Sequence, residues 1–515
     1  MTHTDVIIVG AGPAGLTLAT ELRLAGVRPV VLERQPQPRE TQKAHGIGGL
    51  ILQLLRYRGL LDQVAAATTD PVPPPRFPFG GVHLDFTQLD EPPMRAYPIR
   101  QAALERVLTE RAEELGAEIR RGHALVGLSQ DADLVTAEVQ GPDGPYEITA
   151  RYLVGCDGGR SKTRELAGIP FPGTLYPEVN RLATVTLPDS VTTFENGDLN
   201  VPGVGRVPLG FNHLEGGTFA LGPLVNGVVS FQTTEEELDE VDDDEPLTMD
   251  ELRDSIRRVL GADLPLGEPL RLSRYQFQAR QVESYRDGRI LVAGDAAHLF
   301  PATGTAINVG MQDSINLAWK LAAEVQGWAP AGLLDTYHDE RHYAGERALL
   351  QTRAQVALRR GLDPAADALR QLFQELLLDE QPLRRMGDLV GANLHYPLPG
   401  ANPHRLAGSF APDLTLHTEE GTTTVAYLMR AARPVFLDLA DRPELREVAR
   451  EWADRIDIRT AKTEDRPADA LLIRPDAHIA WAAGIDECGD TAAVALREAL
   501  SSWFGEPEKA AVSAV

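Results

Sequence analysis

The first 33 residues carry the pattern that most restricts how this chain can fold. An apolar segment, Val6 to Gly10, runs directly into the sequence GAGPAG, and a helical pattern follows from Pro13 to Ala25. A second apolar segment, Pro29 to Leu32, ends in Glu33, about 20 residues after the glycines, which is the spacing of a ribose-binding acid. Strand, glycine-rich turn, helix, strand and acid in this order predict a βαβ unit that binds a dinucleotide. They do not say which dinucleotide.

Each glycine of this turn has its own role in such a unit. Gly10 permits the tight turn, Gly12 lets a pyrophosphate approach the backbone, and Gly15 lets the helix pack close to the strand. Glu33 then stands where the hydroxyl groups of a ribose are bound. A GxGxxG sequence alone is weak evidence, so the prediction depends on the elements around it.

Length, charge and cysteine usage restrict the class of protein further. At 515 residues the chain is longer than one hydrophobic core usually supports, so we expect two or three domains. A net charge of -25 argues against a nucleic-acid partner. Cys156 and Cys488 have no metal-ligand spacing, so we expect no metal and a reducing compartment. No apolar run approaches membrane-spanning length and no signal peptide is evident, so we expect no membrane partner and a cytoplasmic location.

A second strand, turn and helix lie between Gly288 and Ala322. The strand Ile290 to Ala293 turns at Gly294 and Asp295, passes a loop rich in Pro, Thr and Gly, and enters a helical pattern near Gly310. Asp295 follows a buried strand, so its carboxylate can reach a ligand hydroxyl, and the helix start suits an anion. An ordinary turn with a solvated Asp is the alternative.

A third candidate loop, GCDGGRSKTR, follows the strand Tyr152 to Val154. Asp157, Gly158 and Arg160 lie in it, and charged, glycine-rich loops after buried strands often bind ligands. A purely structural turn is the alternative here as well. Gln101 stands at the start of a predicted helix, where its side chain can either turn toward a ligand or remain solvated.

The order of the elements predicts an α/β chain with an inserted domain. Residues 171–280 alternate in the manner of β-strands, and the chain then returns to the strand at Ile290. We therefore expect a first part of a nucleotide-binding domain in 1–170, a middle substrate-binding domain in 171–280, a second part with long helices in 281–390, and a linker and C-terminal domain in 391–515.

Together, GAGPAG with Glu33, GCDGGRSKTR, and RILVAGDAAH followed by QDSINLAWKLA resemble the three signature motifs of the class A flavoprotein monooxygenases, the para-hydroxybenzoate hydroxylase group. Within this group the chain is most similar to hydroxylases of angucycline- and anthracycline-type polyketides. The resemblance implies a Rossmann-like FAD-binding domain, an inserted β-sheet substrate domain and a thioredoxin-like C-terminal domain. The last of these has no CxxC, so we expect it to lack redox activity.

The resemblance implies bound FAD, with NADPH or NADH as a transient reductant. Lys43 and Gln101 would contact the middle of FAD, and Asp295 its ribityl chain. Asp157, Gly158 and Arg160 would serve both FAD and the pyridine nucleotide. The positions expected to contact the cofactor are Gly10, Gly12, Pro13, Ala14, Gly15, Glu33, Arg34, Lys43, Gln101, Leu125, Asp157, Gly158, Arg160, Asp295, Pro301, Gly304, Thr305, Ala306, Ile307 and Asn308.

Two positions depart from the family pattern. Lys43 stands where the family more often has Arg, so the bidentate fork is lost. The loop Pro301 to Asn308, expected against the isoalloxazine ring, reads PATGTAIN where the family usually has PxGGQG(M/L)N. Positions that need a positive φ tolerate Gly better than Thr or Ala. We therefore expect either that the ring is held differently here or that its movement between the reduction and oxygenation positions is altered.

The implied activity is transfer of one oxygen atom from a flavin C4a-hydroperoxide to a polycyclic aromatic polyketide, by hydroxylation or Baeyer–Villiger insertion, in antibiotic biosynthesis. Molecular oxygen is the co-substrate, and the protein is expected to be a monomer or homodimer. His45 and His298 are candidate bases, although a structural role is favoured for each. Three alternatives stay open: a flavin-binding accessory protein, a reductase or dehydrogenase without oxygen transfer, and a monooxygenase that degrades phenols or inactivates antibiotics.

Overall fold

The computed structural model describes residues 2–38, 44, 46–68, 71–237, 245–301, 305–361, 363–398 and 404–507. The chain forms two compact units, one made of residues 1–172 with 281–515 and the other of Gly173–Arg280. Lys43, His45 and Gly304 lie outside the described residues. Among the described helices, none is long and apolar enough to cross a membrane.

The first unit is built around a sheet whose central strands are parallel. Its main order is β19-β20-β10-β1-β2-β7, and β8 and β9 extend β10 as an antiparallel meander. Residue Leu153 of β10 lies opposite Ile290 of β20, so the chain leaves this sheet and returns to the neighbouring position. The strands are β1 (Thr2–Val9), β2 (Pro29–Glu33), β7 (Glu118–Arg121), β8 (Ala124–Gln130), β9 (Val135–Gly141), β10 (Gly144–Gly155), β19 (Arg286–Asp287) and β20 (Ile290–Val292).

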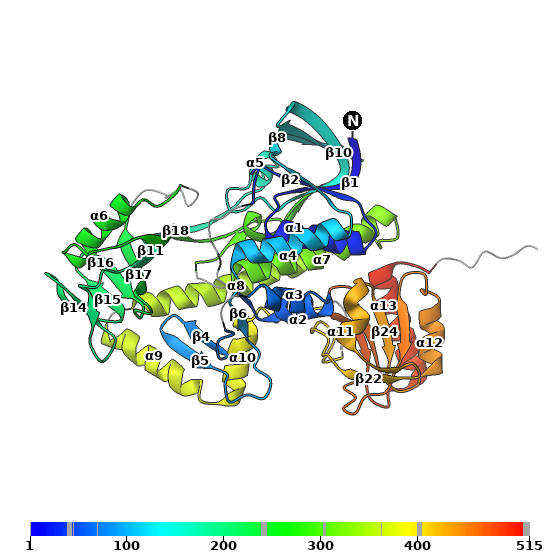
Figure 1. The fold of residues 1–515 in the computed structure, drawn as a ribbon. Coiled ribbons are helices and arrows are strands. Elements are labelled where there is room, and N and C mark those ends of the chain that lie inside the picture. The colour runs from blue at the N-terminus through cyan, green and yellow to red at the C-terminus, as the bar shows by residue number, and fades with distance from the viewer. Residues whose placement is uncertain are drawn as a thin grey trace, which may run out of the picture. The chain divides into compact units, whose positions relative to one another are not determined.

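Helices cover this sheet because their apolar residues face its buried strands. In Figure 1, α1 lies beside both α4 and α7, and it contacts each of them. The helices of this region are α1 (Pro13–Leu24), α2 (Leu50–Tyr57), α3 (Leu61–Ala66), α4 (Gln101–Glu114), α5 (Lys162–Leu166), α7 (Ala306–Gln326), α8 (Asp335–Arg360), α9 (Pro364–Leu376) and α10 (Glu380–Val390). Short strands complete it: β3 (Ile47–Gly48), β4 (Arg76–Phe79), β5 (Val82–Asp85), β6 (Ala96–Tyr97) and β21 (His298–Leu299).

The second unit, green in Figure 1, is the inserted β-sheet domain that the sequence predicts. Five of its strands pair in the order β15-β16-β17-β11-β18, and all these pairs are antiparallel. Helix α6 (Met249–Leu260) begins at Thr248, whose hydroxyl accepts a hydrogen bond from the Glu251 N–H. The strands are β11 (Gly173–Thr186), β12 (Thr192–Thr193), β13 (Leu199–Val201), β14 (Gly205–Val207), β15 (Gly210–Leu214), β16 (Gly217–Leu221), β17 (Val228–Glu236) and β18 (Pro269–Gln281).

The C-terminal part of the first unit forms its own four-stranded sheet, in the order β25-β24-β26-β27. Strands β24 and β25 are parallel and the other two pairs are antiparallel, which is the arrangement expected of a thioredoxin-like core. Its elements are β22 (Thr415–Thr418), β23 (Gly421–Thr424), α11 (Val425–Leu428), β24 (Val435–Asp438), α12 (Pro443–Arg450), β25 (Asp457–Thr460), β26 (Ala470–Ile473), β27 (Ile479–Ala483) and α13 (Gly489–Phe504).

Candidate functional site

The turn between β1 and α1 has the close packing and the open space that a nucleotide-binding turn requires. Gly10 has a φ of +105°, and a Cβ on it would lie 2.4 Å from the carbonyl oxygen of Cys156. A Cβ on Gly15 would lie 2.0 Å from the Gly10 carbonyl oxygen, so α1 packs here because Gly15 has no side chain. No described atom lies within 4 Å of a Cβ built on Gly12, the residue that precedes α1. This space fits a pyrophosphate at the helix start.

Glu33 lies at the same edge of the sheet, at the carboxyl end of β2. Its carboxylate accepts hydrogen bonds from the backbone N–H groups of Ala11, at 2.9 Å, and Gln35, at 2.8 Å. Arg34, next to it, is exposed. Each carboxylate oxygen accepts more than one hydrogen bond, so a ribose hydroxyl can donate to Glu33 beside these two amides.

The turn after β20 packs directly on α1 and α7. Gly294 has a φ of +64°, and a Cβ on it would lie 3.1 Å from the Cβ of Ala14. A Cβ on Gly310 of α7 would lie 3.0 Å from the Gly294 Cα, and the Ser314 hydroxyl donates to the Ala14 carbonyl at 2.8 Å. Asp295 follows Gly294 and is exposed. The fold thus brings the first and second glycine turns, far apart in sequence, to one place.

A buried carboxylate on α7 holds the second turn in place. Asp313 accepts hydrogen bonds from the Gly294 N–H at 2.9 Å, from Nε2 of His298 at 2.7 Å and from Nε of Arg341 at 2.6 Å. Burial raises the pKa of Asp313, but the charges of His298 and Arg341 outweigh burial, and the pKa lies below its ordinary value. Asp313 is therefore ionised and fixes the Gly294 turn to α7.

The first turn of α7 begins at Ala306, one turn before the expected position. Thr305 already has right-handed dihedral angles, with φ −109° and ψ −46°, and its hydroxyl accepts a hydrogen bond from Gln351 at 3.2 Å. Glycine is therefore not required at Thr305 for conformational reasons. Asn308 accepts a hydrogen bond from the Gly48 N–H at 3.0 Å. Pro301 is buried and Ile307 is half-buried, and an altered setting of the ring stays a prediction.

The loop after β10 uses its carboxylate to start α5. The two oxygens of Asp157 accept hydrogen bonds from the hydroxyl of Ser161, at 2.5 Å, and the N–H of Thr163, at 3.0 Å. Gly158 has a φ of +84°, and Arg160 is exposed. The Asp157 carboxylate thus orders the start of α5, and the predicted contacts of Asp157, Gly158 and Arg160 with a ligand stay predictions.

Two further predicted contacts lie on α4 and in the meander. Oε1 of Gln101 accepts a hydrogen bond from the Ala44 N–H at 3.2 Å, and its Nε2 donates to Glu105 at 2.8 Å. Gln101 therefore lies against the segment that follows Lys43. Leu125 is buried in β8 and pairs with Val139 of β9, and its contact with FAD stays a prediction.

The one candidate base that the structure describes has a structural setting. His298 is fully buried, bonded to Asp313 and stacked on Phe300 with ring centroids 4.6 Å apart. These contacts place His298 within the turn, and a role for it as a base stays a prediction. His45 lies outside the described residues.

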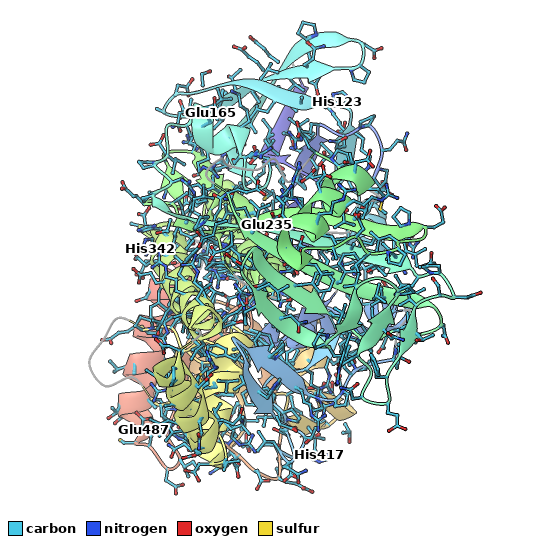
Figure 2. The ribbon with its side chains drawn as sticks, turned by 90° about the vertical axis from the view of Figure 1, so that its left-hand side faces the viewer. His123, Glu165, Glu235, His342, His417 and Glu487 are labelled. Carbon is cyan, nitrogen blue, oxygen red and sulfur yellow. The ribbon has the colours of Figure 1, made fainter. Side chains whose placement is uncertain are left out.

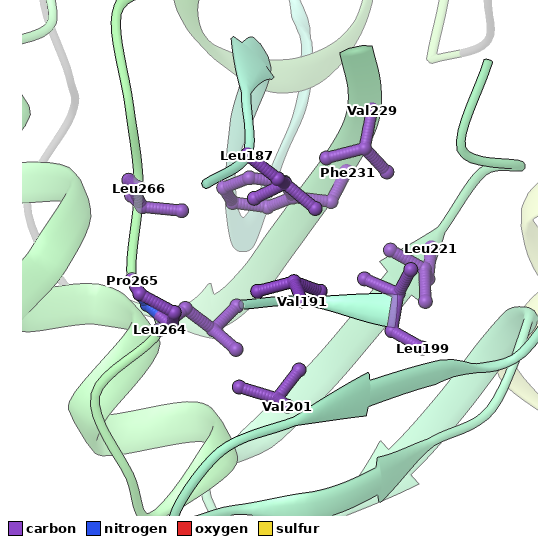
Figure 3. Close-up of a pocket in the computed structure, with 10 residues that line it drawn as sticks. All are labelled: Leu187, Val191, Leu199, Val201, Leu221, Val229, Phe231, Leu264, Pro265 and Leu266. Carbon is purple, nitrogen blue, oxygen red and sulfur yellow. The ribbon is translucent and has the colours of Figure 1, made fainter. Parts of the chain in front are cut away.

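Two cavities of the described structure lie away from these turns. The one in the inserted domain has a volume of about 10 Å³, no more than a single water requires, and is lined by hydrocarbon side chains (Figure 3). An open depression of about 430 Å³ lies beside β7 and the β9–β10 hairpin and is lined by His123, which Figure 2 labels, with Arg120 and Tyr146. Neither has the enclosed, largely apolar form of a pocket for a polycyclic ligand.

Comparison with known proteins identifies the family. A family model described as an FAD binding domain matches residues 3–352, and one described as an aromatic-ring hydroxylase C-terminal domain matches residues 404–507. The chain belongs to the class A flavoprotein monooxygenases. It is therefore an FAD-dependent oxidoreductase, and the resemblance of its three motifs is confirmed. FAD fits the residues present, because the glycine turn at Gly12 is open and both turns meet at α7.

Relatives of this flavoprotein family match the whole chain. A 12-dehydrotetracycline 5-monooxygenase/anhydrotetracycline 6-monooxygenase from Streptomyces rimosus is 40% identical over 98% of this chain and 99% of its own. A dialkyldecalin synthase from Streptomyces rugosporus is 38% identical over 97% of this chain and 98% of its own. The crystal structure of CabE, an aromatic hydroxylase from angucycline biosynthesis, superposes with a TM-score of 0.86 at 38% identity, covering 98% of this chain and all of the other.

Reasoning from the sequence missed the residues that hold this flavoprotein site together. Asp313 and Lys320 are the charged residues in the first 15 positions of α7, a helix whose neighbouring residues are buried. A charged residue in an otherwise buried helix needs a partner, so these two charges could have been recognised from the sequence as members of a buried ion pair. Nothing in the sequence marked Arg341 as the partner of Asp313. Arg164 lies in the loop GCDGGRSKTR but was not among the predicted contacts; it donates to the Ala296 carbonyl at 3.0 Å and lies over the Phe171 ring.

Proposed function

We propose that this chain transfers one oxygen atom from molecular oxygen to a polycyclic aromatic polyketide in antibiotic biosynthesis, with NADPH or NADH as reductant. The observation that carries the proposal is the match over 98% of the chain to a monooxygenase of tetracycline-type substrates. The second support is the TM-score of 0.86 with an aromatic hydroxylase from angucycline biosynthesis. Both proteins are named for fused aromatic substrates.

In this proposal the residues of the chain bind FAD and orient it. Bound FAD supplies hydride acceptance and oxygen activation, which side chains do not supply. Glu33 would hold the adenosine ribose, the turn at Gly12 the pyrophosphate and Asp295 the ribityl chain. The first backbone N–H groups of α7 have no partner within the helix, so they would stabilise negative charge on the pyrimidine edge of the ring.

The inserted domain offers a surface suited to a flat, polar-edged substrate. On the sheet face opposite α6, Nε2 of Gln232 donates to Asn180 at 2.8 Å, and the Tyr275 hydroxyl donates to Oε1 of Gln232 at 2.9 Å. Thr234 also donates to Asn180, at 2.9 Å. Gln232, Thr234 and Tyr275 are half-buried and carry amide and hydroxyl groups on this face of the sheet. They would bind the phenol and quinone oxygens of a fused-ring substrate.

The test uses the purified full-length protein with FAD. Oxidation of NADPH and of NADH is followed with and without anhydrotetracycline or an angucyclinone under ¹⁸O-labelled dioxygen. We expect oxidation to accelerate with the correct ring system and a product heavier by one labelled oxygen atom. Products that carry no label with any fused-ring phenol or quinone would contradict oxygen transfer, and the position of the label distinguishes hydroxylation from Baeyer–Villiger insertion.

A second function is favoured by one relative. The dialkyldecalin synthase matches 97% of the chain at 38% identity and is not named as an oxygenase. If this chain shares that type of role, FAD binds but substrate does not accelerate NAD(P)H oxidation. An isomeric product of unchanged mass would then support this reading, which corresponds to a flavin-binding protein without oxygen transfer.

A further inference from the structure

Two consecutive residues of α8 connect the flavin-binding turns with the C-terminal domain. Arg341 donates from Nε to Asp313 at 2.6 Å, from Nη2 to the Val309 carbonyl at 3.2 Å, and from Nη1 to the Tyr396 hydroxyl. Asp313 in turn holds the Gly294 N–H at 2.9 Å. A continuous chain of hydrogen bonds therefore runs from Tyr396 to the turn that presents Asp295.

Tyr396 belongs structurally to the C-terminal domain. Its backbone N–H donates to the Gly408 carbonyl at 2.9 Å, and its ring lies 4.6 Å from the His478 ring, centroid to centroid. The ring is 2% exposed, and its hydroxyl faces the Arg341 guanidinium. Tyr396 thus places one hydroxyl group of the C-terminal region on the arginine that bonds to Asp313.

The neighbouring residue Glu340 makes a second contact with the C-terminal domain, through Arg474. It accepts hydrogen bonds from Nη2 of Arg474 at 2.8 Å, from Lys320 at 2.8 Å and from Asn316 at 2.6 Å. Arg474 also bonds to Asp476 and lies 4.6 Å from the Trp503 ring centroid. The charges of α7, of α8 and of the turn between β26 and β27 therefore meet in one buried cluster.

Packing alone does not explain why charged side chains are buried between these two regions. Lys320, Arg341 and Arg474 are opposed by Asp313, Glu340 and Asp476, and all six side chains are buried. Removing each charge from water carries a large desolvation penalty, and the attraction within a buried ion pair often recovers no more than that penalty, so this cluster adds little net stability. Apolar contacts such as Trp319 with Trp503, 6.1 Å between centroids, already supply packing.

We propose that Tyr396 and Arg341 are positioning residues through which the C-terminal domain sets the Gly294–Asp295 turn for FAD. Tyr396 orients Arg341, Arg341 orients Asp313, and Asp313 holds the Gly294 N–H. The domain lacks the CxxC of a redox thioredoxin, and this contact assigns it a different task. The inference rests on FAD binding at the proposed site but not on oxygen transfer.

The test compares two substitutions that each remove one buried phenol hydroxyl from the same interface. Tyr396→Phe removes the acceptor of Arg341. Tyr57→Phe is the matched control, because the Tyr57 hydroxyl donates to the Ala411 carbonyl at 2.8 Å and has no bond to Asp313 or Arg341 among the described contacts. The FAD dissociation constant is measured by flavin fluorescence, and thermal unfolding is measured on the apoproteins. We expect a five- to tenfold weaker FAD affinity for Tyr396→Phe and an unchanged affinity for Tyr57→Phe.

A double-mutant cycle tests whether Tyr396 acts through Asp313. In an Asp313→Asn background, adding Tyr396→Phe should weaken FAD binding no further, because the coupling is already broken. Additive losses would overturn the route through Asp313. Should Tyr396→Phe fold poorly, Arg341→Lys, which keeps the charge and loses the fork, is measured in the same way.

If Tyr396→Phe lowers only the unfolding temperature and binds FAD as tightly as the wild type, the proposal is overturned. The Tyr396 contact would then stabilise the fold without affecting the FAD site. Wild-type protein that binds FAD without oxygenating any substrate would contradict the proposed function alone. Wild-type protein that binds no FAD would overturn both.

Discussion

At the residue scale, the three glycines of the first turn differ in what a side chain would meet. Gly10 and Gly15 face backbone atoms at 2.4 and 2.0 Å, so the fold itself requires them. Gly12 has a φ of −79° and open space where a Cβ would lie, so the protein alone does not require glycine there. A requirement for glycine at Gly12 would therefore come from a ligand.

Gly12→Ala consequently separates ligand binding from folding. We expect the apoprotein to unfold within about 0.5 kcal/mol of the wild type, since Ala adopts this backbone conformation without strain. FAD affinity should fall at least tenfold, because the new methyl group occupies the space assigned to the pyrophosphate. Flavin titration and thermal unfolding of the two apoproteins measure the two effects. Unchanged FAD affinity would place the pyrophosphate elsewhere.

At the scale of elements, α7 and α8 are joined by charges as well as by apolar contacts. Asp313, Asn316 and Lys320 recur at intervals of three and four residues, so they lie on one face of α7. Glu340 and Arg341 of α8 face them. Helix α7, which begins at the predicted flavin loop, is therefore fixed to α8 by hydrogen bonds and ion pairs between buried side chains.

This pairing predicts an acid-sensitive junction. Burial raises the pKa of Glu340, but the charges of Arg474 and Lys320 outweigh burial and lower it to about 2 from 4.5. A depressed carboxyl pKa contributes stability that is complete above pH 4.5 and is lost as the pH falls toward 2. The free energy of unfolding should therefore fall more steeply with acidification in the wild type than in Glu340→Gln. The free energy of unfolding is measured by urea titration between pH 4.5 and 2. An equal decrease in the wild type and in Glu340→Gln would contradict the lowered pKa of Glu340.

At the scale of the whole molecule, the C-terminal domain is part of one core with the nucleotide-binding helices. Trp319 and Ala323 of α7 are buried in a cluster with Trp452, Leu496 and Phe504 of the C-terminal domain. Arg58 of the segment after α2 donates to the carbonyl groups of Met429 and Pro475. The two regions therefore depend on each other for burial.

A chain that ends at Leu398 should accordingly fail to fold. The truncation exposes the apolar face around Trp319 and leaves Glu340 without Arg474, and an uncompensated buried charge costs about 3–5 kcal/mol. We expect the truncated protein in the insoluble fraction, while the full chain expressed in parallel is soluble and binds FAD. A monodisperse truncated protein that binds FAD with wild-type affinity would contradict this dependence and also the proposed influence of the C-terminal domain on the FAD site.

The sequence was sufficient for features that depend on local spacing. Gly10, Gly12, Gly15 and Glu33 lie within one βαβ unit, where each role follows from its distance along the chain. The return to the sheet at Ile290 likewise predicts the inserted domain, because parallel strands require a crossover. The family comparison confirms FAD and the fold class. The individual contacts to FAD stay predictions.

Only the tertiary structure decided which polar side chains meet. The carboxylate of Asp157, a predicted FAD contact, accepts hydrogen bonds from Ser161 and Thr163 at the start of α5, and Thr305 has a backbone conformation that requires no glycine. Asp313, Arg341 and Tyr396 are separated by tens of residues, and no periodicity marks the last two. A buried charge is stable only beside its partner, and partners distant in sequence are chosen by packing in three dimensions. The glycine turns were therefore predictable from the sequence, and the cluster that positions them was not.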